Sequence, residues 1–273
     1  MRGVDNRENI DSRSTMKSVT SVLLLAGTTE ATKIANVLVR DYHVDVLSSL
    51  AGVTLDPAPR AGRVRSGGFG GVEGLANHLR TDPVDAILDA THPFAAVMPF
   101  HVAAAAAKTA TPACRVLRPA WTETPEDQWT VVPDLAGALG ALANFGSRRV
   151  MLSVGRQGTG AFVELDAWFL IRAIEMPDIL PARHRLVLSR GPFDLEAERV
   201  LLSSQRIDAL VTKNAGGAST SAKLVAAREL GIPVVMIARP AQPEVTTVSN
   251  LDQALEWLDG VVGLGSPSYE RGV

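Results

Sequence analysis

Cysteine is almost absent from this chain of 273 residues, in which Cys114 is the only one. A single thiol excludes an intramolecular disulfide and a cysteine-rich metal site, and it is typical of proteins from the reducing cytoplasm. The five histidines show no metal-ligand spacing. We therefore expect a cytoplasmic protein that holds no metal.

A strong excess of one charge and a long apolar run are also lacking. The formal net charge is −2 at pH 7, which excludes proteins that bind nucleic acid or anionic membranes through an overall positive field. No apolar run reaches the length of a membrane span, since the stretch of small residues at 103–107 is too short. We expect no nucleic-acid partner and no membrane partner.

Several catalytic signatures are missing too. The two tyrosines, Tyr42 and Tyr269, do not begin a Tyr-x-x-x-Lys motif, which excludes the short-chain dehydrogenase mechanism. The chain has no Gly-x-x-x-x-Gly-Lys-Ser/Thr loop and no Gly-x-Ser-x-Gly elbow, so an ordinary P-loop ATPase and a serine hydrolase are excluded. Of the dinucleotide fingerprint Gly-x-Gly-x-x-Gly, only Gly27 is present.

The chain does have a regular alternation of strand and helix patterns. Hydrophobic residues make up 46% and charged residues 21%, a globular composition. The alternation predicts an α/β fold with parallel sheets flanked by helices. We expect two such domains at 19–118 and 119–262, with a disordered extension at 1–18 and a loose tail at 263–273.

The first predicted strand leads directly into a helix through a tight turn. Residues 22–26 are apolar, and Gly27, Thr28 and Thr29 separate them from a helical pattern. Backbone N–H groups at such a helix start form a ready phosphate site. A plain turn of an α/β fold explains the same residues equally well.

The end of the next predicted strand bears on the choice of cofactor. Ser48 and Ser49 follow the strand pattern of 44–47, about 20 residues after Gly27, where an NAD site usually has Asp or Glu. A carboxylate there would repel a 2′-phosphate, whereas hydroxyl groups can donate hydrogen bonds to it. The pair therefore favours NADPH over NADH, although serines also simply mark strand ends.

Further candidate residues follow other predicted strands, at the sheet edge where ligands bind. In the first domain, the candidate cofactor ligands are Gly68, Phe69, Asp89, Thr91 and His92. For the second domain and the segment before it, the candidates are Arg118, Arg156, Ser189, Arg190, Lys213, Asn214 and Gly216. The arginines can clamp carboxylates through paired N–H donors. Two such edges facing each other would enclose a cleft between the domains.

Each of these residues also has a structural interpretation. Asp89 can orient its loop, and the arginines can be surface ion-pair residues. His92 can donate a proton, hydrogen-bond a cofactor amide, or serve as a structural histidine beside Pro93. The glycines around Phe69 can form a flexible loop without any ligand.

The motifs taken together resemble the precorrin-6A reductase family, NADPH-dependent enzymes of cobalamin (corrin ring) biosynthesis. They are LLLAGTTEA (23–31), SSLAG (48–52), GGFGGVEGL (67–75), DATHPFA (89–95), LRP (117–119) with Trp121, SRGPF (189–193), VTKNAGG (211–217) and VMIARP (235–240). They run in order over nearly the whole chain from position 22 to about 260. Ala26 stands where the family usually has Gly, and Ala215 where it often has Ser, and both are small changes.

The resemblance implies two Rossmann-like domains, with NADPH on the N-terminal one. It implies reduction of one double bond of the precorrin-6A macrocycle to give precorrin-6B, so the arginines and Lys213 would meet the carboxylates of a tetrapyrrole. Lys213 would also stabilise developing charge, and His92 is the candidate proton donor, with bound water or a substrate carboxyl as alternatives. We expect a monomer or a weak homo-oligomer.

Two rival functions remain open at this point. A non-redox tetrapyrrole synthase or isomerase would explain a cleft with basic residues, but it leaves Ser48 and Ser49 without a purpose. A non-catalytic nucleotide-sensing module would need the first domain only, and it leaves the second set of strand-end loops unexplained.

Overall fold

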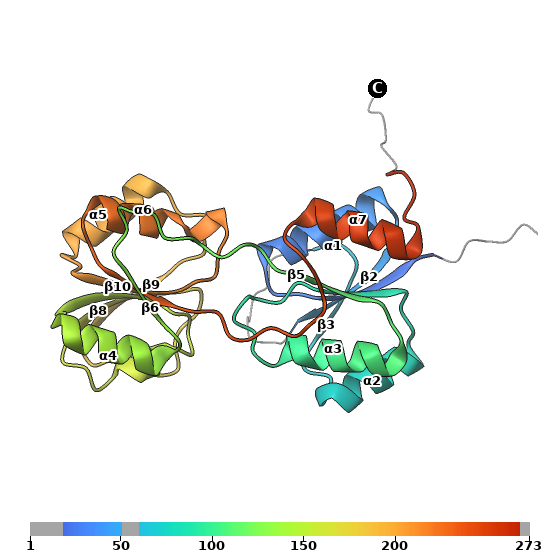
Figure 1. Cartoon of the computed structure of the whole chain (residues 1–273), viewed down its shortest axis with the longest axis horizontal. Coiled ribbons are helices and arrows are strands. Elements are labelled where there is room, and N and C mark those ends of the chain that lie inside the picture. Colours follow the sequence, from blue (N-terminus) through green and yellow to red (C-terminus); the bar gives the residue numbers. More distant parts are fainter. Residues whose placement is uncertain (1–18, 51–59, 268–273) are drawn as a thin grey trace, which may run out of the picture.

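A computed structural model describes residues 19–50 and 60–267, and these form two parallel sheets joined side by side (Figure 1). The first sheet has six strands. In spatial order they are β3 (Arg63–Ser66), β2 (Asp45–Leu50), β1 (Ser21–Leu25), β4 (Ala86–Asp89), β5 (Ala113–Val116) and β12 (Thr246–Val248). Every pairing in the sheet is parallel.

The second sheet repeats this arrangement with six parallel strands. In spatial order they are β9 (His184–Leu188), β8 (Trp168–Ala173), β7 (Arg149–Ser153), β10 (Ala209–Lys213), β11 (Val234–Ile237) and β6 (Trp129–Val132). The first sheet follows the doubly wound order 3-2-1-4-5-6, in which the order reverses between its first and fourth strands. Strands β7 to β11 of the second sheet have the same arrangement, with the reversal between β7 and β10, but the position beside β11 is filled by β6, which precedes β7 in the sequence. The predicted α/β class with two parallel-sheet, Rossmann-like domains is therefore confirmed.

The last position of the first sheet is filled by a strand from the far end of the chain. Strand β12 pairs with β5, and the N–H of Leu117 donates to the carbonyl of Val248 beyond the ladder. Helix α7 (Leu251–Val262) follows β12, and its Ala254 and Leu258 are buried in the first core. The structure thus differs from the division drawn from the sequence, which assigned all of 119–262 to the second domain.

The reason for this difference is burial. The apolar stripe of α7 covers the sheet face beside α1 (Thr29–Asp41), and Figure 1 shows these two helices next to each other although they lie at opposite ends of the sequence. A sheet with open apolar area gains about 25 cal/mol for each Å² covered. Contacts between segments so far apart in the sequence leave no local signal, so the three residues of β12 were not recognised as a strand of the first sheet.

Helices cover both faces of each sheet, as Figure 1 shows. On the first sheet, α1 and α7 lie on one face, while α2 (Gly71–Thr81) and α3 (Met98–Thr109) lie on the other. On the second sheet, α4 (Leu135–Phe145) and η1 (Thr159–Phe162) cover one face. The opposite face carries α5 (Leu195–Ser204) and α6 (Ala222–Glu229), which the short η2 (Ala218–Thr220) precedes.

The central strands show why the sequence folds this way. Residues 22–25 of β1 are all buried, because helices cover both faces of the sheet and every side chain of the strand enters a core. In α1, Ile34, Ala35 and Leu38 form the buried stripe that packs on it. The fold therefore places the carboxyl ends of β1, β2 and β4 along one edge of the first sheet.

The described residues also contain no helix long and apolar enough to span a bilayer, and no group of three or more metal-ligating side chains. Cys114 is a free, buried thiol, and burial raises its pKa to about 12, so it is not a reactive nucleophile. The predicted disordered extension 1–18 lies outside the described residues, as do residues 268–273 of the predicted tail.

Candidate functional site

The turn after β1 leaves open space at the start of α1. Gly27 has a φ of +149°, and nothing lies within 4 Å of the position that a Cβ would occupy. Thr28 caps the helix by accepting from the N–H of Ala31 (3.2 Å), and its hydroxyl donates to the carbonyl of Ala90 (2.9 Å). Thr29 is exposed. The helix start is thus tied to the loop after β4, at the point where the strand order reverses.

The two serines lie inside β2 rather than after it. Ser48 and Ser49 pair in register with β1 on one side and β3 on the other, so the strand continues through Leu50. Ser48 is 0% exposed, and its hydroxyl has no hydrogen-bond partner among the described residues. Ser49 is 5% exposed, and its hydroxyl oxygen accepts from Arg65 at 2.8 Å.

Arg65 is a residue that the sequence reasoning missed. Its guanidinium lies over the ring of Phe69, 3.8 Å from the centroid. It also donates to the carbonyls of Gly67 (3.0 Å) and Gly68 (3.1 Å). The glycine-rich loop is therefore ordered around a cation. The available signal in the sequence was an arginine at the end of the short strand pattern 63–65, directly before the glycine-rich loop.

The carboxylate of Asp89 is occupied by protein groups. It forms a buried ion pair with Arg115 of β5, which is 1% exposed. It also accepts from the N–H (3.0 Å) and the hydroxyl (2.7 Å) of Thr91. Asp89, one of the candidate cofactor ligands, therefore holds the loop after β4 in place, and Arg115 is a second missed residue. An arginine within the apolar pattern of 113–116 was its signal.

His92 stands where the two domains meet. Part of its surface is open to solvent, yet the surrounding protein desolvates the ring and lowers its pKa to about 4. The positive charges of Arg118, Lys213 and Arg239 add to this effect. The Nδ1 atom accepts from the N–H of Phe94 at 3.2 Å, which assigns the ring proton to Nε2. The ring is neutral at pH 7, so it can donate a hydrogen bond but carries no imidazolium proton to transfer.

The lowered pKa of His92 predicts a stability effect. Because its pKa is lower in the folded protein than the ordinary 6.5, the unfolded chain binds more protons between about pH 6.5 and about pH 4. The folded protein therefore loses stability as the pH falls through this range. Above about pH 6.5, the titration of His92 does not change the stability. We expect His92→Gln to gain stability over wild type, measured by urea unfolding, on going from about pH 7 to about pH 5. A difference that stays constant over that range would contradict the assignment.

Lys213 ends β10, at the point where the order of the second sheet reverses. Its ammonium lies 5.2 Å from the ring centroid of Phe94, a residue of the first domain that packs against the second core. Desolvation lowers the pKa of Lys213. Among the described residues, no carboxylate pairs with this ammonium. Lys213 and His92 are thus brought together from separate domains.

Arg118 joins the two domains. It lies in the segment between β5 and β6, and Figure 1 shows this segment and the one between β11 and β12 crossing from one sheet to the other. Its guanidinium forms an ion pair with Glu30 of α1 (2.9 Å) and donates to the carbonyl of Ala215 (2.7 Å). Arg239, on the other crossing segment, donates to the carbonyls of Arg118 (2.9 Å) and Asn214 (2.8 Å). Arg239 is a third residue that the sequence reasoning missed.

Asn214 and Gly216 brace the same junction. The Asn214 side chain accepts from the N–H of Trp121 (2.8 Å) and donates to the Trp121 carbonyl (3.0 Å). Gly216 has a φ of +69°, and a Cβ there would collide with the carbonyl oxygen of Pro119. Both residues therefore have structural partners in the segment that enters the second domain.

The remaining candidates follow β7 to β9. Arg156 forms an ion pair with Glu175 (3.3 Å) and approaches Asp178 (4.0 Å). The N–H of Ser189 donates to the carbonyl of Ala173 (3.0 Å), and Arg190 is exposed. These residues share the carboxyl edge of the second sheet with Lys213. Arg156 follows β7, the neighbour of β10, whereas Ser189 and Arg190 follow β9 at the far end of the sheet.

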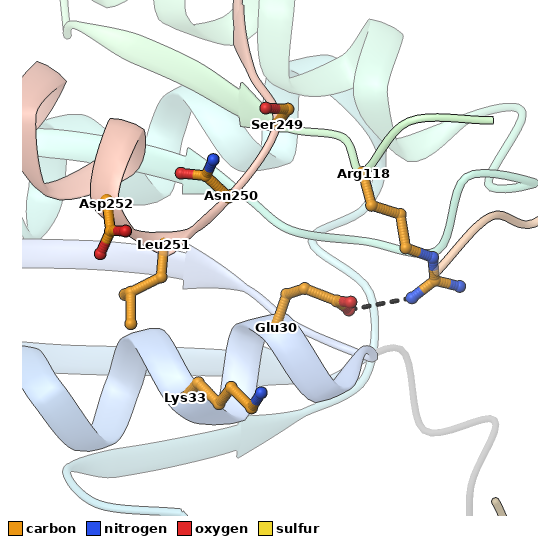
Figure 2. Close-up of a pocket in the computed structure, with 7 residues that line it drawn as sticks. All are labelled: Glu30, Lys33, Arg118, Ser249, Asn250, Leu251 and Asp252. Atoms are coloured by element: carbon orange, nitrogen blue, oxygen red, sulfur yellow. Dashed lines mark hydrogen bonds and ion pairs between the residues drawn. The ribbon is translucent and has the colours of Figure 1, made fainter. Parts of the chain in front are cut away.

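A pocket of about 330 Å³ lies between the first turns of α1 and α7, and Figure 2 shows the residues that line it. Arg118 reaches Glu30 across it, and Lys33 and Asp252 lie on its walls. Asn250, another lining residue, caps α7 by accepting from the N–H of Gln253 at 2.9 Å. The pocket contains both cations and carboxylates, and Arg118 is the one sequence-predicted site residue that lines it.

The comparisons with known proteins agree with this architecture. Residues 21–259 match the family model of precorrin-6x reductase CbiJ/CobK. The chain belongs to this family. It is 48% identical over 243 residues to the precorrin-6A reductase of Rhodococcus erythropolis, covering 88% of this chain and 98% of that protein.

Two further relatives support the family assignment. The chain is 48% identical over 246 residues to the precorrin-6A reductase of Mycobacterium tuberculosis strain H37Rv, covering 89% of this chain and 99% of that protein. A solved structure of CobK precorrin-6A reductase superposes with a TM-score of 0.82 at 40% identity, covering 93% of this chain and 100% of that one. The family resemblance drawn from the motifs is thereby confirmed.

Proposed function

We propose that this protein is a precorrin-6A reductase, which reduces one double bond of the precorrin-6A macrocycle to give precorrin-6B in cobalamin biosynthesis. The observation that carries this proposal is the 48% identity to a precorrin-6A reductase over 98% of that protein's length. The contact between the domains supports it, because His92 of the first domain and Lys213 of the second come together there. We expect the enzyme to work in the cytoplasm, as a monomer or a weak homo-oligomer.

NADPH is the proposed reductant, and the first domain fits it. The open space above Gly27 and the start of α1 suit a diphosphate. Next along the edge, Arg65 and Phe69 offer a cation and an aromatic face at the position of the adenosine. Bound NADPH supplies the hydride. The protein contributes the position and the exclusion of water.

His92 and Lys213 have separate proposed roles at the nicotinamide end. The neutral His92 ring can donate from Nε2 to the carboxamide of the cofactor and so orient it. The ammonium of Lys213 can bind a substrate carboxylate or stabilise negative charge that develops on the conjugated ring. Because His92 carries no proton to transfer at pH 7, bound water or a substrate carboxyl is the better proton donor.

The substrate is proposed to extend from Lys213 along the carboxyl edge of the second sheet. Strands β10, β7, β8 and β9 are neighbours in that order, so β9 lies about 14 Å from β10 at about 4.8 Å per strand. The distance of about 14 Å between β10 and β9 is similar to the width of a tetrapyrrole ring with its side chains. Arg156 and Arg190, at the ends of β7 and β9, would then meet peripheral carboxylates of the ring.

The test is reduction of precorrin-6A by the purified protein with NADPH, and with NADH as the control. We expect NADPH to be oxidised in step with a product that has gained two hydrogens, measured by absorbance and mass spectrometry. A product of unchanged hydrogen content would favour the non-redox synthase or isomerase instead. Binding of NADPH without turnover of any tetrapyrrole would favour the nucleotide-sensing alternative.

A further inference from the structure

The guanidinium of Arg65 lies where the adenosine ribose of a dinucleotide sits in a doubly wound sheet. In such sheets the ribose lies beside the end of the second strand, next to the helix start that binds the diphosphate. Ser49 of β2 pairs with Leu25 of β1 on one side and with Arg65 of β3 on the other. Arg65 is therefore level with the last residue of β1, two strands along the same edge.

The side chain of Arg65 is held in place before any ligand arrives. The Nη1 atom donates to the hydroxyl oxygen of Ser49 (2.8 Å) and to the carbonyl of Gly67 (3.0 Å), and Nη2 donates to the carbonyl of Gly68 (3.1 Å). The ring of Phe69 fixes the plane of the guanidinium at 3.8 Å. These bonds use three of the five N–H donors of an arginine, which leaves two for an anion.

The charge of Arg65 is not balanced by a carboxylate among residues 19–50 and 60–267. Arg63, two residues earlier on the same strand, shows the contrast, because it forms an ion pair with Asp45 at 2.7 Å. All three acceptors of Arg65 are neutral oxygens. A positively charged, preorganised group at a ligand-binding edge suits a phosphate dianion, because little freedom is lost on binding.

We propose that Arg65 recognises the 2′-phosphate of NADPH and thereby selects this cofactor against NADH. The proposal rests on the proposed function, and it gives that function's cofactor site its specificity-determining residue. Ser49 acts through Arg65, since its hydroxyl oxygen orients the guanidinium. Ser48 faces the core without exposure, so its hydroxyl takes no part in the contact.

The experiment measures the dissociation constants of NADPH and NADH for wild type, Arg65→Ala and Arg63→Ala by fluorescence titration. Arg65→Ala is expected to weaken NADPH binding about tenfold, the loss of one charge-assisted contact, while NADH binding changes less than about twofold. Arg63→Ala is the matched control, because its exposed ion pair with Asp45 lies on the same strand. It is expected to leave both constants unchanged.

A purely structural role for Arg65 would appear differently. If Arg65 only orders the loop at 67–71, its removal would weaken NADPH and NADH equally, and this result would overturn the assignment. Normal NADPH binding by Arg65→Ala would overturn it as well. Failure of the wild-type protein to bind NADPH would overturn the proposed function and the assignment together, so the two failures are distinguishable.

Discussion

Lys213→Ala is expected to lower kcat/KM for the macrocycle by about 30- to 100-fold, which corresponds to about 2–3 kcal/mol for a hydrogen bond to a charged group. The expected loss follows from the surroundings of the Lys213 ammonium group. Lys213 lies against the ring of Phe94, desolvation lowers its pKa, and no carboxylate among the described residues neutralises it. Its charge is therefore available to a substrate carboxylate or to charge that develops on the ring.

Steady-state kinetics with NADPH and precorrin-6A measure this effect. Lys108→Ala is the control, because Lys108 pairs with Glu73 on the surface between α3 and α2. We expect no change in its kinetics. Lys213→Ala is also expected to keep the melting temperature of the wild type, since it removes a desolvated charge that has no ionic partner. A large loss of stability with unchanged kcat/KM would show that Lys213 is structural.

Arg115→Met is expected to destabilise the folded protein by about 3–5 kcal/mol, the usual effect of removing one partner of a buried ion pair. The variant would leave the Asp89 carboxylate buried with only the N–H and hydroxyl of Thr91 as donors. Because Asp89 holds the loop that carries His92, we also expect weaker cofactor binding. Chemical unfolding at pH 7 measures the first effect.

Two control variants separate the buried pair from a general effect of removing arginine. Arg63→Met breaks the exposed pair with Asp45, and it is expected to change stability by less than about 1 kcal/mol. The double variant Asp89→Leu with Arg115→Met removes both charges and is expected to recover most of the loss. Equal losses in Arg63→Met and Arg115→Met would show that burial of the Asp89 pair has no special weight.

The strand, turn and helix of the proposed cofactor site were largely predictable from the sequence. The apolar strand at 22–25, the glycine turn and the helix after it are local features, and the structure has them in that form. The roles of individual polar residues were less predictable. Asp89 stood out as a candidate ligand, but its ion pair with Arg115 comes from a neighbouring strand 26 residues away. Such pairing has no local signal.

For Ser48 and Ser49, the sequence also predicted the position of the residues but not their partners. Their position near the end of β2 was evident, and their hydroxyl groups led to the expectation of NADPH rather than NADH. Arg65, which lies beside Ser49 through strand pairing, supplies a cation at that point. The sequence pattern does not show which residue of β3 will pair with Ser49 of β2, so Arg65 was not recognised as a candidate.

The sequence by itself determined the α/β class, the two parallel sheets and the family. Hydrophobic periodicity and the order of the motifs are local features, which can be seen in the sequence without any knowledge of the fold. The tertiary structure decided the sheet to which β12 and α7 belong, the neutral state of His92 and the partners of Arg65, Asp89 and Arg118. These depend on burial and charge between segments far apart in sequence, and such energies exist only once the chain has brought those segments together.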